Sequence, residues 1–298
     1  MNACFTRRDF LRTSGIATAA FAFAPTSLDA ADAPVSSGKR GIKKAIMWST
    51  IAFKGSVLEK MEAVKAAGFE GVEPMGGMDR DEVKKALDVT GLKAASVCCH
   101  THWAKPFSDP NPAARELGLE GLKTSLQDAK QYGATSVLLV PGVVNDKVTY
   151  DECFQRSIVE IRKAIPMAQE LGVKIAIENV WNNFITKPEQ AVRYLEEINS
   201  PHVGWHFDIG NVLRYGPPQE WIPALGKHIL KLHIKGFSQA KRFSVKLEEG
   251  DNNWPAIMKA LDAVGYAGWG ISEQPGDQAK DAASLKELSD SMSRIFAL

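Results

Sequence analysis

A regular alternation of short apolar runs with longer amphipathic segments, from Lys43 to the end of the chain, constrains the fold more than any other feature. The short runs have the length and composition of buried strands, and the segments between them carry apolar residues three and four positions apart, as amphipathic helices do. Eight such runs follow one another: KKAIMWS, GVEPM, KAASVCCH, SVLLVPG, KIAIENV, VGWHFDIGN, ILKLHIKGF and GWGISEQPG. Eight strands that alternate with eight helices predict a single α/β domain with the (β/α)8 fold, a TIM barrel.

Glycines at the ends of the helical patterns support this division of the chain. A residue with positive φ commonly ends a helix, and glycine adopts that conformation most easily; the candidates are Gly68, Gly91, Gly133, Gly172 and Gly265. The last helix is expected to begin after Asp281. A doubly wound open sheet is the alternative, but none of the strands is followed by the glycine-rich phosphate turn that many such folds use.

The composition is that of an ordinary globular protein. Of the 298 residues, 45% are hydrophobic and 24% charged, and 36 Lys and Arg against 35 Asp and Glu leave a net charge of +1. Because no basic run appears anywhere, we expect no nucleic-acid partner. Cys98, Cys99 and Cys153 follow neither a disulfide nor a zinc-ligand spacing and are interpreted as core residues.

The first thirty-three residues differ from the rest of the chain. The segment TRRDFLRTSGIATAAFAFAP places Arg7 and Arg8 before Phe10, Leu11 and a short alanine-rich stretch, and so resembles a twin-arginine export signal. Its apolar part is much shorter than the ~20 residues that span a bilayer, so stable membrane insertion is not expected. We therefore interpret residues 1–33 as an export signal with a short linker and residues 34–298 as the barrel. The twin-arginine machinery would then export the folded protein to a periplasmic or other extracytoplasmic location.

Polar residues end four successive strands of the predicted barrel. These are Glu178, Asp208, His233 and Glu273, on the fifth to eighth runs. Any one of them alone could cap a helix, pair with a lysine or pack in the core. Active sites of TIM barrels lie at the carboxyl ends of the strands, however, and there the four side chains would converge. Three carboxylates and one imidazole suit one divalent metal ion, Mn²⁺ or Mg²⁺ foremost, with Co²⁺ and Zn²⁺ also compatible.

The same strand ends carry a resemblance to a known family. The segments GFEGVEP, IENVWN, FDIGN, LHIKG and EEGDNNWPAIMKALDAVGYAGWGISE resemble the sugar phosphate isomerase/epimerase group of xylose-isomerase-like TIM barrels, along the chain from Lys43 to about Phe296. That group includes ketose 3-epimerases and hydroxypyruvate isomerases. The resemblance implies that Glu178, Asp208, His233 and Glu273 bind one divalent metal, and that Glu178 and Glu273 are the catalytic acid and base.

This chemistry agrees with what the residues allow. Removal of a proton next to a carbonyl creates an enediolate, whose charge a metal can stabilise, and two carboxylates on opposite faces of a small carbohydrate can remove and return the proton. The expected activity is therefore that of an isomerase or epimerase of a ketose or related hydroxy-carbonyl compound. The alternatives are a lyase that eliminates from a 3-keto-sugar at the same site and a sugar-binding barrel without activity. A repair endonuclease with this barrel would need several more strand-end ligands.

Three further residues near the predicted ligands are candidates. Asn211 follows Asp208 by three residues, where ketose epimerases of this family often have a substrate-binding His, so this departure leaves the particular epimerase activity open. His206 has the same strand parity as Asp208 and should face the barrel interior one layer deeper, either orienting a ligand or packing as a polar core residue. Lys235 shares parity with His233 and could contact a substrate oxygen or pair with a carboxylate.

The remaining candidates lie on other strands and on one loop. Glu73, His100 and His102 come from the opposite side of the barrel and are expected to recognise hydroxyl groups. The loop after the seventh strand, SQAKRFSVKLEEGDNNW, is longer than usual, and Arg242 in it could contact a substrate or be solvated. Barrels of this kind often form dimers or tetramers, so a homo-oligomer is expected.

Overall fold

A computed structural model describes residues 41–298 of the chain. The predicted export signal lies outside the described residues.

All strands of the described part run parallel in one sheet, in the order β3-β2-β1-β9-β8-β7-β6-β5-β4. Their bounds are β1 Lys43–Met47, β2 Gly71–Glu73, β3 Lys93–Ala94, β4 Val97–Cys98, β5 Ser136–Leu139, β6 Lys174–Glu178, β7 Val203–Asp208, β8 Ile229–Ile234 and β9 Trp269–Ser272. The third predicted strand is thus present as two short pieces, of which β3 pairs with β2 and β4 pairs with β5. The predicted strand positions are confirmed, and the single-domain (β/α)8 fold with them.

The sheet closes where those two pieces meet. Cys98 N–H donates to the carbonyl of Pro74 at 2.9 Å, and Gly76 N–H donates to the carbonyl of Cys98 at 2.8 Å. These bonds continue the pairing of β2 past β3 and on to β4, which turns an open sheet into a nearly closed barrel.

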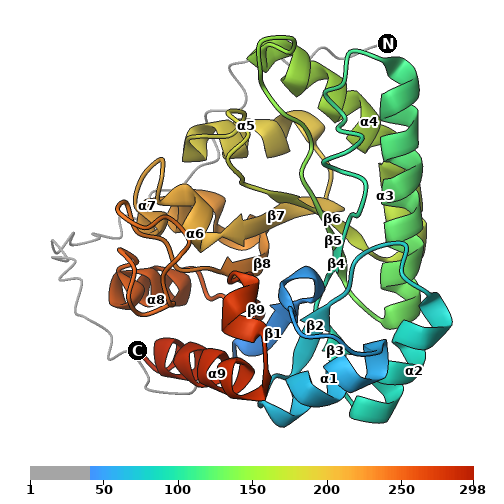
Figure 1. Cartoon of the computed structure of the whole chain (residues 1–298). Coiled ribbons are helices and arrows are strands. Elements are labelled where there is room, and N and C mark those ends of the chain that lie inside the picture. The colour runs from blue at the N-terminus through green and yellow to red at the C-terminus, as the bar shows by residue number, and fades with distance from the viewer. Residues whose placement is uncertain (1–40) are drawn as a thin grey trace, which may run out of the picture. The chain divides into compact units, whose positions relative to one another are not determined.

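Helices lie outside the strands (Figure 1). They are α1 Val57–Ala66, α2 Arg80–Thr90, α3 Pro112–Tyr132, α4 Tyr150–Leu171, α5 Pro188–Ile198, α6 Ile209–Val212, α7 Pro218–Leu225, α8 Trp254–Ala263 and α9 Ala282–Phe296, with 3₁₀ turns η1 Trp48–Thr50, η2 Gly226–His228 and η3 Gly276–Ala279. The five glycines named above all have positive φ, and Asp281 caps α9 through the Ser284 N–H, as predicted. No helix within residues 41–298 is long and apolar enough to cross a membrane.

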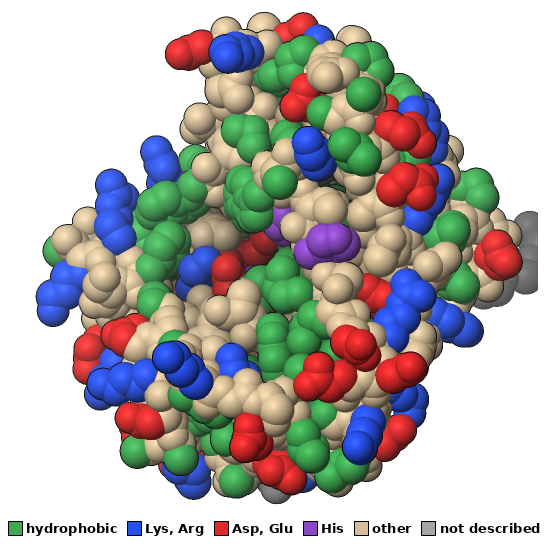
Figure 2. Space-filling view, turned by 45° about the vertical axis from the view of Figure 1, so that its right-hand side comes forward, with side chains coloured by type: hydrophobic (Ala, Val, Ile, Leu, Met, Phe, Trp, Pro, Cys, Tyr) green, Lys and Arg blue, Asp and Glu red, His purple; other side chains and the backbone are tan. Residues whose placement is uncertain are grey.

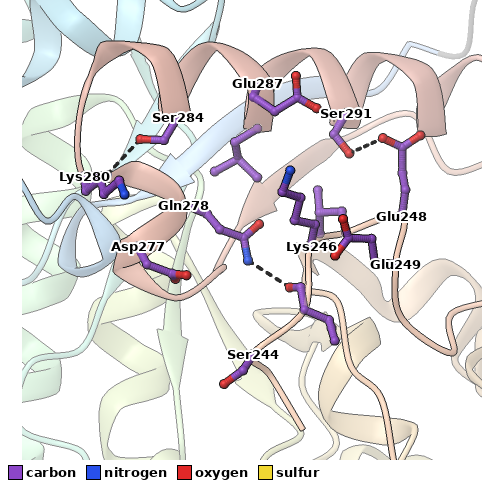
Figure 3. Close-up of a pocket in the computed structure, with 13 residues that line it drawn as sticks. Ser244, Lys246, Glu248, Glu249, Asp277, Gln278, Lys280, Ser284, Glu287 and Ser291 are labelled. Atoms are coloured by element: carbon purple, nitrogen blue, oxygen red, sulfur yellow. Dashed lines mark hydrogen bonds between the residues drawn. The ribbon is translucent and has the colours of Figure 1, made fainter. Parts of the chain in front are cut away.

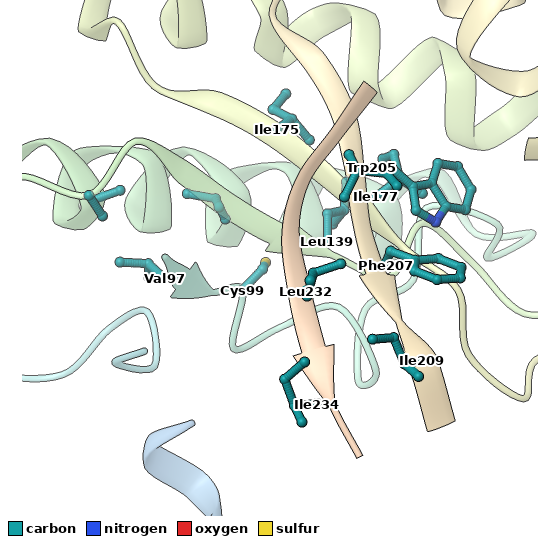
Figure 4. Packing of buried hydrophobic residues seen from close by; sticks show 14 of the residues in the cluster. Val97, Cys99, Leu139, Ile175, Ile177, Trp205, Phe207, Ile209, Leu232 and Ile234 are labelled. Atoms are coloured by element: carbon teal, nitrogen blue, oxygen red, sulfur yellow. The ribbon is translucent and has the colours of Figure 1, made fainter. Parts of the chain in front are cut away.

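Strand alternation sorts the side chains into two layers. Successive residues of a strand point to opposite faces, so one set packs outward against the helices and the other fills the barrel. Trp205, Phe207, Leu232 and Ile234 belong to the outer set, part of which Figure 4 shows. Cys98, Cys99 and Cys153 are free and buried, as core residues should be.

Candidate metal centre

The four predicted ligands lie together at the carboxyl ends of β6 to β9. Each offers one ligand atom, and these atoms all lie within 4.8 Å of one another. His233 Nδ1 is 2.9 Å from Glu178 Oε1, 3.1 Å from Glu273 Oε2 and 3.9 Å from Asp208 Oδ2. Parallel pairing explains the convergence, since Asp208 and His233 are direct partners in the register of β7 and β8. Figure 2 shows acidic, basic and histidine side chains gathered on the floor of a hollow.

The ammonium group of Lys235 contacts this cluster. Its Nζ lies 2.8 Å from Glu273 Oε2 and 3.4 Å from both Asp208 Oδ2 and Asn211 Oδ1. Burial lowers the pKa of Lys235, but Asp208 and Glu273 outweigh burial and raise it above its usual value. Lys235 is therefore charged at neutral pH.

Burial and neighbouring charges shift the pKa values of the three ligand carboxyl groups in different directions. Burial raises the pKa of Glu178 and raises that of Asp208 well above its usual value. Burial also acts to raise the pKa of Glu273, but Lys235 and His233 lower it well below the usual range.

The neighbouring carboxylates also shift the pKa of His233. Burial acts to lower its pKa, yet Glu73, Glu273 and Glu178 raise it well above its usual value. A proton on His233 would place positive charge at the point where the three ligand carboxylates meet. Closely spaced oxygen and nitrogen ligands of this kind fit a divalent cation. A bound cation would supply the positive charge in place of that proton.

Asn179 fixes the position of Asp208, and the sequence patterns did not single it out. Its Nδ2 donates to the Asp208 carbonyl at 2.8 Å, and its Oδ1 accepts from Asp208 N–H and from Trp205 Nε1, both at 3.0 Å. Asn211 completes this support, because its N–H donates to Asp208 Oδ1 at 2.7 Å and its Nδ2 to the Asn179 carbonyl at 3.1 Å. The only signal for Asn179 was its place directly after Glu178.

Glu73 and His206 lie deeper in the barrel than the four ligands. Both side chains are completely buried, and Glu73 Oε2 is 3.0 Å from His233 Nε2. His206 faces inward, as its parity predicted, with its ring centroid 4.2 Å from that of His233. Glu73 was expected to bind substrate hydroxyl groups. Its side chain is completely buried against His233, so it does not line the hollow.

The two histidines after β4 differ in exposure. His102 is buried, its Nδ1 accepts from Val140 N–H at 3.3 Å, and burial lowers the pKa of its imidazole to about 4. His100 is exposed and packs against Gly76 and Gly77 of the loop after β2, where a Cβ at Gly76 would lie 2.9 Å from His100 Nδ1.

Arg242 lies beside an aromatic ring. Its guanidinium is 5.4 Å from the ring centroid of Trp181, and Arg214, which the sequence patterns also missed, is 4.8 Å from the same ring. Trp181 packs on Phe243 at 4.8 Å, and Phe243 lies 4.6 Å from Lys235 Nζ. A continuous run of contacts therefore links Arg242 to the cluster.

A separate cavity of about 530 Å³ lies between the loop after β8 and α9 (Figure 3). Ser291 Oγ donates to Glu248 Oε2 at 2.7 Å and Gln278 Nε2 to the Val245 carbonyl at 2.8 Å across it. None of the predicted site residues lines this cavity. The candidate metal ligands lie instead at the carboxyl ends of β6 to β9.

The fold and the ligand set agree with the family comparison. The chain matches the family described as xylose isomerase-like TIM barrel over residues 61–295, and it belongs to that family.

Among similar proteins, L-ribulose-5-phosphate 3-epimerase UlaE of Escherichia coli is 25% identical over 242 residues, which cover 76% of this chain and 85% of the relative. An uncharacterized protein of Methanocaldococcus jannaschii is 27% identical over 196 residues, covering 61% of this chain and 66% of its own.

Solved structures show the same fold at lower identity. A D-tagatose 3-epimerase-like protein superposes with a TM-score of 0.73 at 19% identity, covering 86% of this chain and 97% of its own. The 3-keto-D-glucoside 4-epimerase YcjR from Escherichia coli gives 0.71 at 18% identity, covering 86% and 100%. UlaE and YcjR are sugar epimerases by their names, and the two solved structures share the fold of this chain.

Proposed function

We propose that the protein is a divalent-metal-dependent isomerase or epimerase of a small ketose or related hydroxy-carbonyl compound. The observation that carries this proposal is the set of four ligand atoms, from Glu178, Asp208, His233 and Glu273, within 4.8 Å of one another at the carboxyl ends of β6 to β9. The names of the epimerase relatives support the choice of substrate class. A Mn²⁺ ion is the first choice of metal for this donor set, with Mg²⁺, Co²⁺ and Zn²⁺ as alternatives.

Glu178 and Glu273 are the residues proposed to move the proton. They come from strands on two sides of His233, and their pKa values are shifted in opposite directions: burial raises that of Glu178, whereas Lys235 and His233 lower that of Glu273. Such an asymmetry suits a pair in which one carboxylate takes a proton from carbon and the other returns one. A bound divalent cation would supply the positive charge that stabilises the enediolate between those two steps.

The other residues are proposed to hold the reactants. Asp208 and His233 complete the metal site, and Asn179 keeps Asp208 in place. Lys235 and Asn211 share the mouth of the site and would contact substrate oxygens. His100, His102 and Arg242 are further candidates for substrate recognition.

Export remains a proposal that rests on the Arg7–Arg8 signal alone. An extracytoplasmic enzyme would meet free or glycosidic sugars more naturally than phosphorylated ones. Since YcjR acts on a 3-keto-glucoside by its name, 3-keto-glycosides belong in the first set of substrates to test. Abstraction of the same proton from such a sugar would also start a β-elimination, which is the second candidate activity.

Proton exchange tests the proposal directly. Purified protein loaded with Mn²⁺ and passed through a desalting step would be incubated in D₂O with free ketoses and with 3-keto-glycosides, and deuterium at the carbon next to the carbonyl would be measured by NMR. Glu178→Gln and Glu273→Gln should each reduce exchange by about 10²–10⁴-fold, the usual contribution of a general base. Glu196→Gln, an exposed glutamate on α5, is the matched control.

Three results would contradict or redirect the proposal. A fully active Glu273→Gln variant would refute the two-carboxylate mechanism. Purified protein that neither contains nor responds to a divalent metal would refute the metal-dependent enzyme. Loss of a substituent from the 3-keto-glycoside, seen as a new unsaturated product, would establish the lyase in its place.

A further inference from the structure

His233 contacts one more carboxylate, on the ring edge away from the ligand cluster. Nδ1 of the ring faces Glu178 and Glu273, whereas Nε2 lies 3.0 Å from Glu73 Oε2. Glu73 ends β2, and β1 and β9 separate β2 from β8 in the sheet. This contact therefore crosses the barrel interior, and both side chains in it are completely buried.

The chemistry of an imidazole gives this contact a consequence. A neutral ring carries one proton, and only the nitrogen without it can offer a lone pair to a metal. Carboxylate oxygens accept hydrogen bonds, so Glu178 at Nδ1 and Glu73 at Nε2 could each accept the ring proton. A cation held by Glu178, Asp208 and Glu273 would exclude a proton from Nδ1, and the ring proton would then lie on Nε2, where Glu73 accepts it. In that tautomer the lone pair is on Nδ1, which points at Glu178, Asp208 and Glu273.

The surroundings of Glu73 leave it few other partners. Its Oε1 has no hydrogen-bond partner among residues 41–298, and neither ring nitrogen of His206 has one. His206 Nδ1 is 3.9 Å from Glu73 Oε1, beyond hydrogen-bonding distance. The hydrogen bond that Glu73 makes within this buried region is thus the one to His233.

The same three side chains could instead hold a second cation, because ligand atoms of Glu73, His206 and His233 also lie within 4.8 Å of one another. A cation there would need the lone pair of His233 Nε2. A neutral ring cannot offer Nε2 to one ion while Nδ1 serves another. The cluster with three carboxylates has the larger donor set, and it reaches solvent through Glu273, whose side chain is 23% exposed. The single lone pair of His233 is therefore better used there.

We propose that Glu73 is a positioning residue that holds His233 in the Nε2–H tautomer and in the ring orientation that presents Nδ1 to the metal. The inference rests on the metal site of the proposed function, and it adds a residue from the opposite side of the barrel. Glu73 does not touch the substrate. Replacement of such a carboxylate partner of a metal-bound histidine typically weakens metal binding about 10–100-fold.

Metal affinity, measured without substrate, tests the role of Glu73. Mn²⁺ binding to the wild type, Glu73→Gln and Glu70→Gln would be followed by competition with a chelator, together with the number of ions bound per chain and the melting temperature. Glutamine can donate as well as accept, so it no longer selects one tautomer. We expect one ion per chain throughout, and an affinity about 10–100-fold weaker for Glu73→Gln alone. Glu70, an exposed residue near the start of β2, is the control.

A second measurement does not depend on the variant folding. In the wild type loaded with diamagnetic Zn²⁺, ¹⁵N NMR of the histidine side chains should show His233 protonated on Nε2 and metal-bound through Nδ1. The reverse assignment would overturn the proposal.

The remaining outcomes separate this inference from the proposed function. A lower melting temperature for Glu73→Gln with unchanged Mn²⁺ affinity would show a purely structural role and overturn the inference alone. Two ions per wild-type chain, one of which is lost in Glu73→Gln, would overturn it in favour of the second cation site. A wild type that binds no divalent ion would overturn both the inference and the proposed function.

Discussion

The two sides of the barrel interior are built by the same rule and contain opposite chemistry. On the side of β6 to β9, the inward positions near the strand ends carry Glu178, Asp208, His233 and Glu273. A separate apolar cluster comes mostly from β1, β3 to β5 and the residues that follow them, and extends to β9 and the segment after β6: Ala45, Met47, Ala95, Cys98, Leu138, Val140, Val180 and Ile271. Both sets follow from strand alternation in one continuous sheet. Alternation therefore decides which residues enter the barrel, and residue type decides what each side does there.

The difference has an energetic meaning. The apolar side stabilises the fold by removing hydrocarbon from water, and its side chains need no hydrogen-bond partner. The charged side costs free energy, because buried carboxylates lose their hydration and repel one another, and a bound cation would offset that cost. Glu73 is a buried carboxylate on the apolar side, and its side chain contacts His233 of the charged side.

The largest expected effect on stability comes from opening the apolar side. Leu138→Ala should lower the free energy of unfolding by about 2–5 kcal/mol, because it removes a buried side chain and leaves a cavity. Urea denaturation measures the change. Leu117→Ala, at a leucine that is 55% exposed, should change stability by less than about 0.5 kcal/mol. If Leu138→Ala also weakened metal binding, the two sides would not be independent.

Metal removal should destabilise the charged side. An ion present at 100 times its dissociation constant stabilises the native state by about 2.7 kcal/mol, or roughly 5–10 °C in Tm for a domain of this size. Chelation should remove this increment from the wild type, and Asp208→Asn should show little of it. Calorimetry with and without Mn²⁺ provides the measurement, and Asp146→Asn, at an exposed loop residue, should behave as the wild type. Equal Tm values for the wild type with and without Mn²⁺ would contradict the proposal that the cluster binds a metal ion.

The smallest effect concerns His102, near the apolar side. Its pKa is lowered to about 4 in the folded chain by burial, from 6.5, so the unfolded chain binds more protons between these values. Stability should therefore fall as the pH falls, by about 2 kcal/mol between pH 7 and pH 5 from this residue. Urea titrations at several pH values should show that His102→Gln loses this part of the pH dependence, whereas His228→Gln, at an exposed histidine, retains it. Identical pH profiles for wild type and His102→Gln would contradict the prediction.

Several particular features could be read from the pattern. The strand positions, the helix that begins after Asp281 and the inward direction of His206 follow from local periodicity and capping, and the structure confirms them. The division of the third strand into β3 and β4 was not visible, because it depends on how β2 and β4 approach each other when the barrel closes. The short helices α6 and α7 after β7 were not foreseen in detail either.

The barrel and the gathering of the four candidate ligands at one end of it follow from the order of residues along the chain, because strand periodicity and parallel order depend on local chain geometry. Three other features could be known only from the folded chain: Glu73 lies behind His233, Asn179 holds Asp208, and aromatic side chains connect Arg242 to the cluster. These contacts join residues from different strands and loops through their side chains. Their distances depend on how the closed barrel packs, which no spacing along the chain records.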